Sequence, residues 1–393
     1  MIHCDVVIIG AGAAGMMCAI EAGRRGRSVT VIEHARKPGE KIRISGGGRC
    51  NFTNLHAGPD NFLSANPHFM KSALKRYTQW DFIAWVDAHG IAWHEKALGQ
   101  LFCDGPATQI IEALLADMRR AGVELKLGTS VTRHERTSDG FELVLSDGDE
   151  MACQSLVVAS GGKSIPKMGA TGFGYDMARH YGLAVTETRP ALVPLTFDPD
   201  MLARLKPLAG VAADVRVSRD RAAFDEALLF THRGLSGPAV LQISSYWREG
   251  DDVSVRFRPD LDWYETLRDE RAANGRRAIS TVLADHLPKR LAQMLDEEGG
   301  LSGNLADQSD KRLQHFAGML ENWTVRPTGS EGYRTAEVTL GGVDTGGLDS
   351  RTMQARGVPG LFFVGEVVDV TGWLGGYNFQ WAWSSGWSAG RAV

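Results

Sequence analysis

The sequence of 393 residues lacks the features of several specialised protein classes. No apolar run approaches the ~20 residues that a membrane-spanning helix needs, since the longest are short stretches such as residues 6–9, so a transmembrane protein is excluded. The five cysteines are scattered and include no Cys-x-x-Cys pair, which argues against both a disulfide framework and a zinc site. The first residues show no secretion signal. We therefore expect reduced thiols, no metal and a cytoplasmic protein.

An excess of charge of one sign is also absent. The chain has 43 basic and 47 acidic residues, a formal net charge of −4 and a pI near 6.3. Because nucleic-acid-binding domains usually carry an excess of Lys and Arg, this balance predicts no nucleic-acid partner. The length is enough for about two or three domains with sizeable cores.

The chain begins with a pattern typical of a βαβ unit. Residues 5–10 have the composition of a buried parallel strand, residues 13–25 that of an Ala-rich helix, and residues 28–33 that of the next strand. The turn between the first strand and the helix reads Gly10-Ala11-Gly12-Ala13-Ala14-Gly15.

Each glycine of this turn has a physical reason. Gly10 permits the tight turn, Gly12 lets the backbone approach a pyrophosphate, and Gly15 allows close packing of helix on strand, while the helix N-terminus faces the anion. Glu33 ends the second strand, where it can accept hydrogen bonds from an adenosine ribose. An acid at this place disfavours a 2′-phosphate, so the site should hold FAD or NAD and not NADP.

Three further glycine-rich segments favour FAD. They lie at residues 45–51, 160–162 and 365–376, the last two directly after apolar strand patterns. A dehydrogenase needs one such segment, whereas a flavoprotein must also enclose a ribityl chain and an isoalloxazine ring. We therefore predict FAD as the cofactor, with NAD(P)H as a candidate transient electron donor.

The sequence pattern of the rest of the chain predicts helices and strands in alternating groups. Helices are expected at residues 67–90, 106–121, 262–322 and from about Asn378. Strands are expected at residues 123–127, 130–135, 141–145, 151–159, 211–217, 239–244, 253–257, 324–327, 335–340 and 361–365.

This order predicts an α/β fold with a Rossmann-like FAD-binding domain of the glutathione-reductase type, including a β-meander. That domain is expected to be discontinuous, with residues 1–190 and 341–393. An inserted β-rich domain is expected at residues 191–260 and 324–340, and a helical domain at residues 261–323.

Three long motifs carry a family resemblance. They read Ser45-Gly-Gly-Gly-Arg-Cys-Asn-Phe-Thr-Asn54, Phe230-Thr-His-Arg-Gly-Leu-Ser-Gly-Pro238, and Val364-Gly-Glu-Val-Val-Asp369 followed by Gly375-Gly-Tyr-Asn-Phe-Gln380. With them, the whole chain resembles the YhiN/BaiN-type family of FAD-dependent oxidoreductases, within the glutathione-reductase-like superfamily. The resemblance implies a discontinuous FAD domain that carries a β-barrel-like and a helical insertion.

The glycine-rich segments and the resemblance together predict the cofactor-binding residues. The resemblance implies that Glu366 binds the ribityl hydroxyls and that Asn378 to Gln380 begin a helix beneath the pyrimidine end of the flavin. An N-cap or a surface acid is the alternative for Glu366. The full set is Gly10, Gly12, Ala13, Ala14, Gly15, Glu33, Lys41, Arg43, Ser45, Gly46, Gly47, Arg49, Cys50, Asn51, Val131, Ser160, Gly161, Gly162, Gly365, Glu366, Gly375, Gly376, Asn378, Phe379 and Gln380.

Two residues are candidates for catalysis. His232 is either a proton donor facing the ring or a histidine whose hydrogen bonds hold its loop. Cys50 is either a polarisable wall beside the isoalloxazine or a redox partner, and the wall is favoured because no second cysteine stands at disulfide-oxidoreductase spacing. Arg43 and Arg49 have the charge to neutralise pyrophosphate or flavin.

The predicted activity is transfer of a hydride between flavin N5 and a small organic substrate held between the FAD domain and the insert. The resemblance implies reduction of a carbon–carbon double bond, or oxidation of an amine or alcohol. A flavin oxidase using oxygen is the alternative enzyme, since no second nucleotide fingerprint is present. A flavin-loaded redox sensor is the alternative of another class, and an RNA-modifying role is disfavoured by the charge balance.

Overall fold

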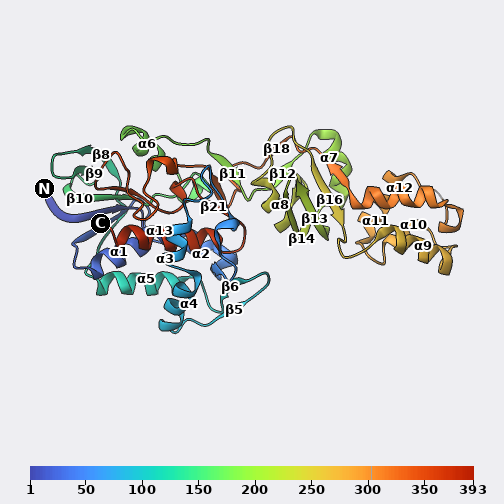
Figure 1. Cartoon of the computed structure of the whole chain (residues 1–393), viewed down its shortest axis with the longest axis horizontal. Coiled ribbons are helices and arrows are strands. Elements are labelled where there is room, and N and C mark those ends of the chain that lie inside the picture. Colours follow the sequence, from blue (N-terminus) through green and yellow to red (C-terminus); the bar gives the residue numbers. More distant parts are fainter. Residues whose placement is uncertain (302) are drawn as a thin grey trace. The chain divides into compact units, whose positions relative to one another are not determined.

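The computed structural model describes residues 1–301 and 303–393, which form two compact units. Unit 1 consists of Met1–Arg189 and Val338–Val393, and unit 2 of Pro190–Glu337 (Figure 1). Both ends of the sequence therefore build unit 1. The β-rich and the helical parts of the insert both lie in unit 2, which forms one compact unit. Their division into two separate domains therefore stays a prediction.

Unit 1 is built on a seven-stranded sheet in the order β7-β2-β1-β10-β9-β8, with β20 paired to β10. The pairs β7–β2, β2–β1, β1–β10 and β10–β20 are parallel, whereas β8, β9 and β10 form an antiparallel meander. This is the predicted Rossmann-like α/β arrangement. The strands are β1 (Ile2–Ile9), β2 (Val29–Glu33), β7 (Glu124–Leu127), β8 (Val131–Arg136), β9 (Phe141–Leu145), β10 (Glu150–Val158) and β20 (Leu361–Phe363).

Helices α1 and α13 pack closely in unit 1, because α13 has small residues where the two meet. A Cβ on Gly386 would lie 2.3 Å from the carbonyl oxygen of Ala14, and one on Gly390 would lie 2.6 Å from that of Cys18. The helices of unit 1 are α1 (Ala13–Arg24), α2 (Glu40–Gly48), α3 (Lys71–Arg76), α4 (Gln79–Ala88), α5 (Thr108–Arg120), α6 (Phe173–His180) and α13 (Tyr377–Gly390).

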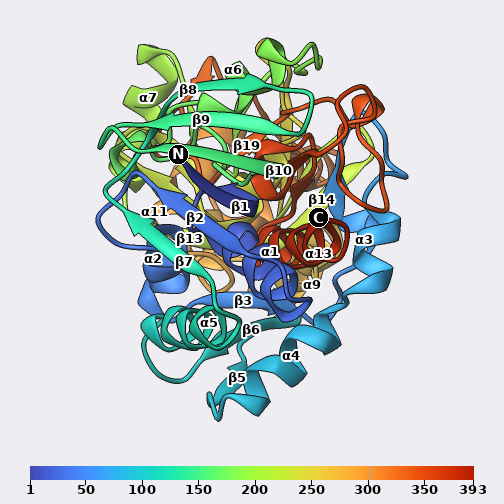
Figure 2. The ribbon, with the colours of Figure 1, turned by 90° about the vertical axis from the view of Figure 1, so that its left-hand side faces the viewer.

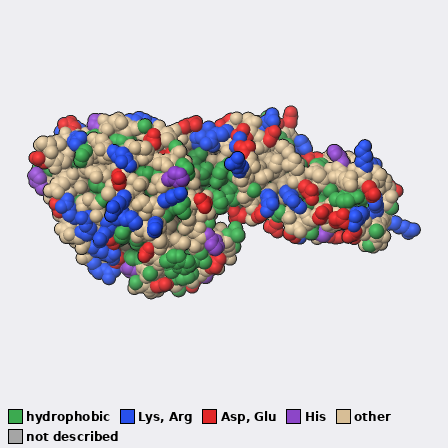
Figure 3. Space-filling model, in the orientation of Figure 1, with side chains coloured by type: hydrophobic (Ala, Val, Ile, Leu, Met, Phe, Trp, Pro, Cys, Tyr) green, Lys and Arg blue, Asp and Glu red, His purple; other side chains and the backbone are tan. Residues whose placement is uncertain are grey.

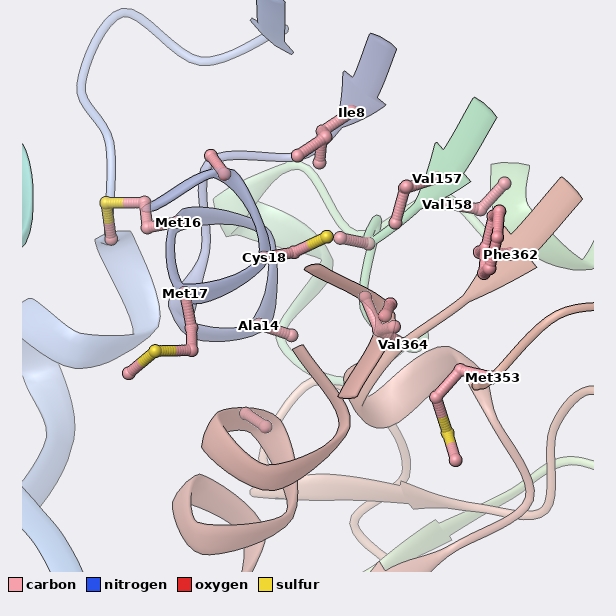
Figure 4. Close-up of a cluster of buried hydrophobic side chains, with 14 of the residues drawn as sticks. Ile8, Ala14, Met16, Met17, Cys18, Val157, Val158, Met353, Phe362 and Val364 are labelled. Carbon is pink, nitrogen blue, oxygen red and sulfur yellow. The ribbon is translucent and has the colours of Figure 1, made fainter. Parts of the chain in front are cut away.

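The core of unit 1 joins the sheet to α1. Figure 4 shows Ile8 of β1, Val157 of β10 and Phe362 of β20 together with Ala14 and Cys18 of α1, all in one buried cluster. Parallel strands covered on both faces need apolar side chains at nearly every position, which explains the continuous Val, Ile and Phe runs of the sequence. The remaining short strands of this unit are β3 (Asn51–Asn54), β4 (Phe62–Leu63), β5 (Trp93–Glu95), β6 (Gln100–Cys103) and β21 (Thr371–Gly372).

Unit 2 contains a second seven-stranded sheet, in the order β17-β16-β13-β14-β15-β12-β18. Its strands are β12 (Leu195–Thr196), β13 (Ala212–Arg219), β14 (Ala222–Thr231), β15 (Gly234–Ser236), β16 (Val253–Phe257), β17 (Trp323–Val325) and β18 (Gly329–Ser330). Its helices are α7 (Pro199–Leu205), α8 (Pro238–Ser244), α9 (Trp263–Asn274), α10 (Ile279–Leu283), α11 (Lys289–Gly299) and α12 (Asp310–Glu321). Strands β11 (Arg189–Ala191) and β19 (Val338–Leu340) lie where the chain passes from one unit to the other.

Some predicted elements are wrong. Residues 239–244 form α8 and not a strand, because Gly237 precedes the helix with a φ of +88° and Pro238 starts it, a local signal that outweighs the short apolar run. Strand β14 was not predicted, since its alanines and acids hide the alternation. Residues 67–90, which were expected to be helical, form two helices, α3 and α4, separated where Thr78 caps α4.

Within the described part of the chain, no helix is long and apolar enough to cross a membrane. The same residues hold no group of three or more His, Cys, Asp and Glu side chains able to bind a metal ion.

Asp117 of α5 ties three helices of unit 1 together. Its side chain is 1% exposed and accepts hydrogen bonds from Trp85 Nε1 and Arg24 Nη2, both at 2.9 Å, and its other oxygen lies 3.0 Å from His89 Nε2. Burial acts to raise the pKa of Asp117, but the bonds from Trp85 and His89 and the charges of His89 and Arg24 outweigh it and hold the pKa below its usual value.

We expect Asp117→Ala to lower the free energy of unfolding by about 2–4 kcal/mol, because it leaves the partly buried Trp85 Nε1 and His89 Nε2 without their partner. Asp176→Ala is the matched control, since that carboxylate pairs with Arg179 in solvent and should cost under about 1 kcal/mol. Denaturant unfolding measures both. A folded-state pKa below the unfolded value of about 3.9 stabilises the protein above that pH, so the difference between Asp117→Ala and wild type should shrink as pH falls through the folded pKa. Equal losses in the two variants would contradict this assignment.

Candidate cofactor and active site

The start of α1 is open to an anion. Gly12 caps the helix with no side-chain hydrogen bond, and the first turn, which includes Ala13 and Ala14, contains no acidic side chain. The free N–H groups and the positive end of the helix dipole therefore face outward. A Cβ on Gly12 would meet no atom within 4 Å, and its φ of −86° suits any residue. The fold alone does not require glycine at this position, whereas a pyrophosphate against the backbone does.

Gly10 and Gly15 differ from Gly12, because the fold itself needs them. Gly10 has a φ of +112°, and its Cβ would lie 2.4 Å from the carbonyl oxygen of Ala159 on the neighbouring segment. A Cβ on Gly15 would lie 1.9 Å from the carbonyl oxygen of Gly10. These two glycines hold β1, β10 and α1 in close contact.

Glu33 turns its carboxylate toward this glycine turn. It accepts the backbone N–H of Ala11 at 2.8 Å and that of Ala35 at 2.9 Å, and His34 Nδ1 lies 3.0 Å from it. The carboxylate is thereby fixed beside the turn, at the carboxyl end of β2. Its contact with a ribose stays a prediction.

Lys41 and Glu366 meet in an ion pair although 325 residues separate them in sequence. Ser164 links the two, because its hydroxyl accepts from Lys41 Nζ at 2.6 Å and donates to Glu366 at 2.9 Å. The backbone N–H of Thr339 donates to the same carboxylate at 3.0 Å. Glu366, which lies in a 3₁₀ turn over Gly365–Val367, is therefore held by three partners and is no solvated surface acid.

Residues missed by the sequence analysis complete this network. Ser164 follows the Gly161-Gly162 pair closely, so a polar residue just after a predicted glycine turn was the available signal. Thr339 had none, because the chain returns to the site only after the whole insert. A Cβ on Gly162 would lie 2.5 Å from Thr339 Oγ1 and 2.6 Å from Glu366 Oε1, which shows how tightly the segments converge.

Other predicted cofactor residues occupy varied settings. The hydroxyl of Ser160 is buried without a hydrogen-bond partner in the described part of the chain, and Gly161 faces open space. A Cβ on Gly365 would lie 2.9 Å from the Cβ of Ala14, so that turn packs on the start of α1. Val131 is buried at the start of β8.

The turn before α13 is shaped by its own side chains. A Cβ on Gly376 would lie 2.4 Å from the carbonyl oxygen of Thr53, and Gly375 has a φ of +110°. The Asn378 amide accepts the N–H of Gly372 at 2.8 Å and donates to its carbonyl at 2.9 Å.

The side chains at the start of α13 are therefore used for positioning. Gln380 is fully buried, accepts from Thr53 Oγ1 at 2.6 Å, and donates to the carbonyl of Tyr77 and the hydroxyl of Ser384. Phe379 stacks on Trp383 with ring centroids 5.8 Å apart. What these residues leave for a ligand is the backbone at the helix N-terminus, as the sequence analysis expected of a helix beneath the flavin.

The segment at residues 45–51 continues from α2 as a glycine turn. Its first residues, Ser45, Gly46 and Gly47, have non-helical backbone angles, and a Cβ on Gly47 would meet nothing within 4 Å. The two predicted arginines are engaged on the protein itself, Arg43 with Glu40 and Arg49 with the carbonyl of Asp104. Asn51 lies beside Gln100, with the two side-chain amides 3.2 Å apart.

Cys50 is fully buried, with a φ of +47°. Burial, and secondarily the neighbouring Cys103, raises the pKa of its thiol. Cys103, the last residue of β6, is its neighbour, and the backbone N–H of Cys103 donates to the carbonyls of Arg49 and Cys50. A neighbouring cysteine is thus present that the sequence spacing concealed. The fully buried thiol of Cys50 exposes no surface to a ligand, so the wall and the redox partner both stay predictions.

His232 lies in unit 2, in the turn between β14 and β15, and is exposed. Within the described residues its side chain makes no hydrogen bond. The turn is held by Thr231, whose hydroxyl accepts from the N–H of Arg233 at 3.2 Å and donates to the carbonyl of Gly234 at 3.1 Å. This arrangement disfavours a loop-holding role for the histidine and leaves its imidazole free for proton transfer.

Several known proteins resemble this chain over its whole length. A ribosomal RNA dihydrouridine synthase of Escherichia coli (strain K12) is 53% identical, covering 98% of this chain and 97% of that protein. A 3-dehydro-bile acid delta(4,6)-reductase of Clostridium scindens is 30% identical, covering 98% of each. Among solved structures, a 3-ketosteroid-delta4-(5alpha)-dehydrogenase of Rhodococcus jostii RHA1 matches with a TM-score of 0.50 at 16% identity, covering 99% of this chain and 97% of that one, which shows the shared fold.

These relatives overturn one prediction, the absence of a nucleic-acid partner with only a small-molecule substrate. A second ribosomal RNA dihydrouridine synthase, of Haemophilus influenzae, is 45% identical over the full chain. The prediction failed because net charge averages over the sequence, whereas RNA responds to the local surface. Figure 3 shows Lys and Arg side chains gathered near the ends of α1 and α5, despite the balanced total.

The family itself follows from a match over nearly the whole sequence. The profile described as HI0933-like protein Rossmann domain matches residues 4–392. Its extent includes the glycine turn at the start of α1, the Lys41–Glu366 pair and the helix α13. This chain belongs to the HI0933-like family and is an FAD-dependent oxidoreductase.

Proposed function

We propose that the chain is a ribosomal RNA dihydrouridine synthase, which reduces the C5=C6 double bond of a uridine in ribosomal RNA. The observation that carries the proposal is the 53% identity, over both full lengths, to a protein of that name. The open pyrophosphate site at Gly12 supports the redox half of the activity, because it suits an FAD dinucleotide.

The chemistry sets the tasks of the protein side chains. Reduced FAD supplies a hydride. Because the C5=C6 bond of uracil is conjugated with the C4 carbonyl, the hydride joins C6, negative charge moves to O4, and a proton must reach C5. A general acid within reach of C5 is therefore needed, together with donors for O4.

We assign the proton donor to His232. An exposed imidazole can carry a proton at neutral pH, and Thr231, not the histidine, secures its turn. NADH or NADPH is proposed as the transient reductant, since net reduction of uridine consumes one hydride, supplied through the flavin, and one proton from the general acid.

The proposal is tested with purified protein, NADPH or NADH, and ribosomal RNA from a strain that lacks the gene. After digestion to nucleosides, mass spectrometry should find a uridine that has gained two hydrogen atoms, and the Gly12→Val protein should form none. A flavin that is reduced and then reoxidised only by oxygen, with no dihydrouridine in the RNA, would reject the synthase and favour the oxidase.

A further inference from the structure

Guanidinium groups from separate segments of unit 1 gather around one indole ring. Trp387 lies half-buried in the last turns of α13. The Cζ of Arg76, at the end of α3, is 5.0 Å from its ring centroid, and that of Arg391, just after α13, is 5.8 Å away. Arg76 also donates to the carbonyl of Arg351. We call Arg76, Arg351, Arg391 and Trp387 the arginine cluster.

The arginine cluster has no carboxylate to balance it. Within the described residues, none of its three arginines forms an ion pair. Asp349, two residues before Arg351, instead accepts hydrogen bonds from the backbone N–H of Arg351 and from the hydroxyl of Thr352. Burial, and then the charges of Arg351 and Arg391, lower the pKa of Arg76. Like charges held this close repel one another, so a bound anion would relieve the repulsion.

The cluster is remote from the cofactor site. It lies at the C-terminal end of α13, whereas the turn at Gly376 lies at the other end, and a helix of 14 residues is about 20 Å long. Figure 2 shows α3 beside the end of α13 and the chain terminus. A ligand that contacts both the turn before α13 and the arginine cluster must span about this length, as a segment of an RNA chain can.

We propose that the arginine cluster binds backbone phosphates of the RNA substrate, an inference that rests on the proposed function. Cation–π contact with the indole of Trp387 helps to hold the guanidinium groups of Arg76 and Arg391 in place. Their N–H groups that are not bonded to the protein can then donate to phosphate oxygens. Such contacts position the RNA without reading its sequence and bring a strong dependence on salt. The cluster therefore anchors the RNA at a distance from the uridine that is reduced.

The test compares the double variant Arg351→Ala/Arg391→Ala with wild type in binding to a ribosomal RNA fragment across a salt series. Both side chains are exposed, so the fold should survive. We expect Kd to rise about tenfold or more and the slope of log Kd against log salt to fall by ~1.5, the loss of two phosphate contacts. FAD content, Tm and the rate of flavin reduction by NADPH should be unchanged.

The matched control is Arg179→Ala/Arg216→Ala, which removes two exposed arginines that are paired with Asp176 and Asp225. Its Kd and salt slope should stay within about twofold of wild type, since paired arginines release few counterions. Arg76→Lys, which keeps the charge but loses the stack, should weaken binding by a smaller factor than the double alanine variant.

The outcomes separate the two proposals. If the double variant binds the RNA with the Kd and salt slope of wild type, the phosphate site is wrong, whatever the reaction. If the variant loses RNA binding but wild type forms no dihydrouridine, the site stands and the proposed reaction fails. If wild type forms dihydrouridine and the variant does so only with a raised KM, both stand.

Discussion

Replacing Gly12 by valine should yield a folded protein that holds no FAD. The space beside Gly12 is empty within 4 Å of a Cβ and its backbone angles suit any residue, so the substitution costs the fold little. A valine side chain would, however, occupy the path of the pyrophosphate to the N-terminus of α1. The flavin absorbance per chain of the purified variant measures the effect directly.

Gly15→Val is the matched control, because the same side chain there collides with the carbonyl oxygen of Gly10. That variant should fail to fold, whereas Gly12→Val should unfold with the Tm of wild-type apoprotein and gain no stability from added FAD. Full FAD occupancy in Gly12→Val would show that the phosphate site lies elsewhere.

Replacing His232 by alanine should slow reduction of the RNA uridine by ~10²–10⁴-fold, the usual effect of losing a general acid. The imidazole is exposed and Thr231 holds the turn, so folding and FAD content should not change. Single-turnover oxidation of the pre-reduced enzyme by RNA isolates the step, because it excludes the reductant and product release.

His315→Ala removes an exposed histidine on α12 of the same unit and should react at the wild-type rate. The pair of variants is compared in rate and in Tm. A normal single-turnover rate with a lowered Tm in His232→Ala would assign the histidine to structure and remove it from the reaction.

The first βαβ unit could be predicted because its determinants are local. Gly10, Gly12 and Gly15 act within a few residues of the strand and helix that they join, and the apolar runs of β1 and β2 mark buried strands without any knowledge of the remaining chain. The short apolar run at residues 239–244 could not be assigned by pattern alone, since a buried strand and a short helix look alike over that length.

The convergence of distant side chains is what local patterns could not provide. Lys41, Ser164 and Glu366 come from three segments that meet only when the sheet is complete. Gln380 was predicted from its motif to bind the cofactor. Its side-chain amide instead accepts a hydrogen bond from Thr53 and donates one to the carbonyl of Tyr77. A motif identifies a position but does not say which atoms remain free.

The substrate class was mispredicted for a related reason. Net charge summed over 393 residues is near zero, but the arginines around Trp387 lie far apart in sequence and are assembled by the fold. Their lack of carboxylate partners in the described part of the chain is a property of contacts and not of composition. A local basic site can therefore exist in a chain of balanced charge.

The central claim is that electrons pass from the flavin of this protein to a uridine of ribosomal RNA. Its most direct test is an anaerobic single turnover, in which the reduced holoenzyme is mixed with ribosomal RNA from a strain that lacks the gene. Flavin absorbance should return, and one dihydrouridine should form for each flavin oxidised. A flavin that stays reduced in the presence of the RNA, or reoxidises without an equal yield of dihydrouridine, would contradict the claim.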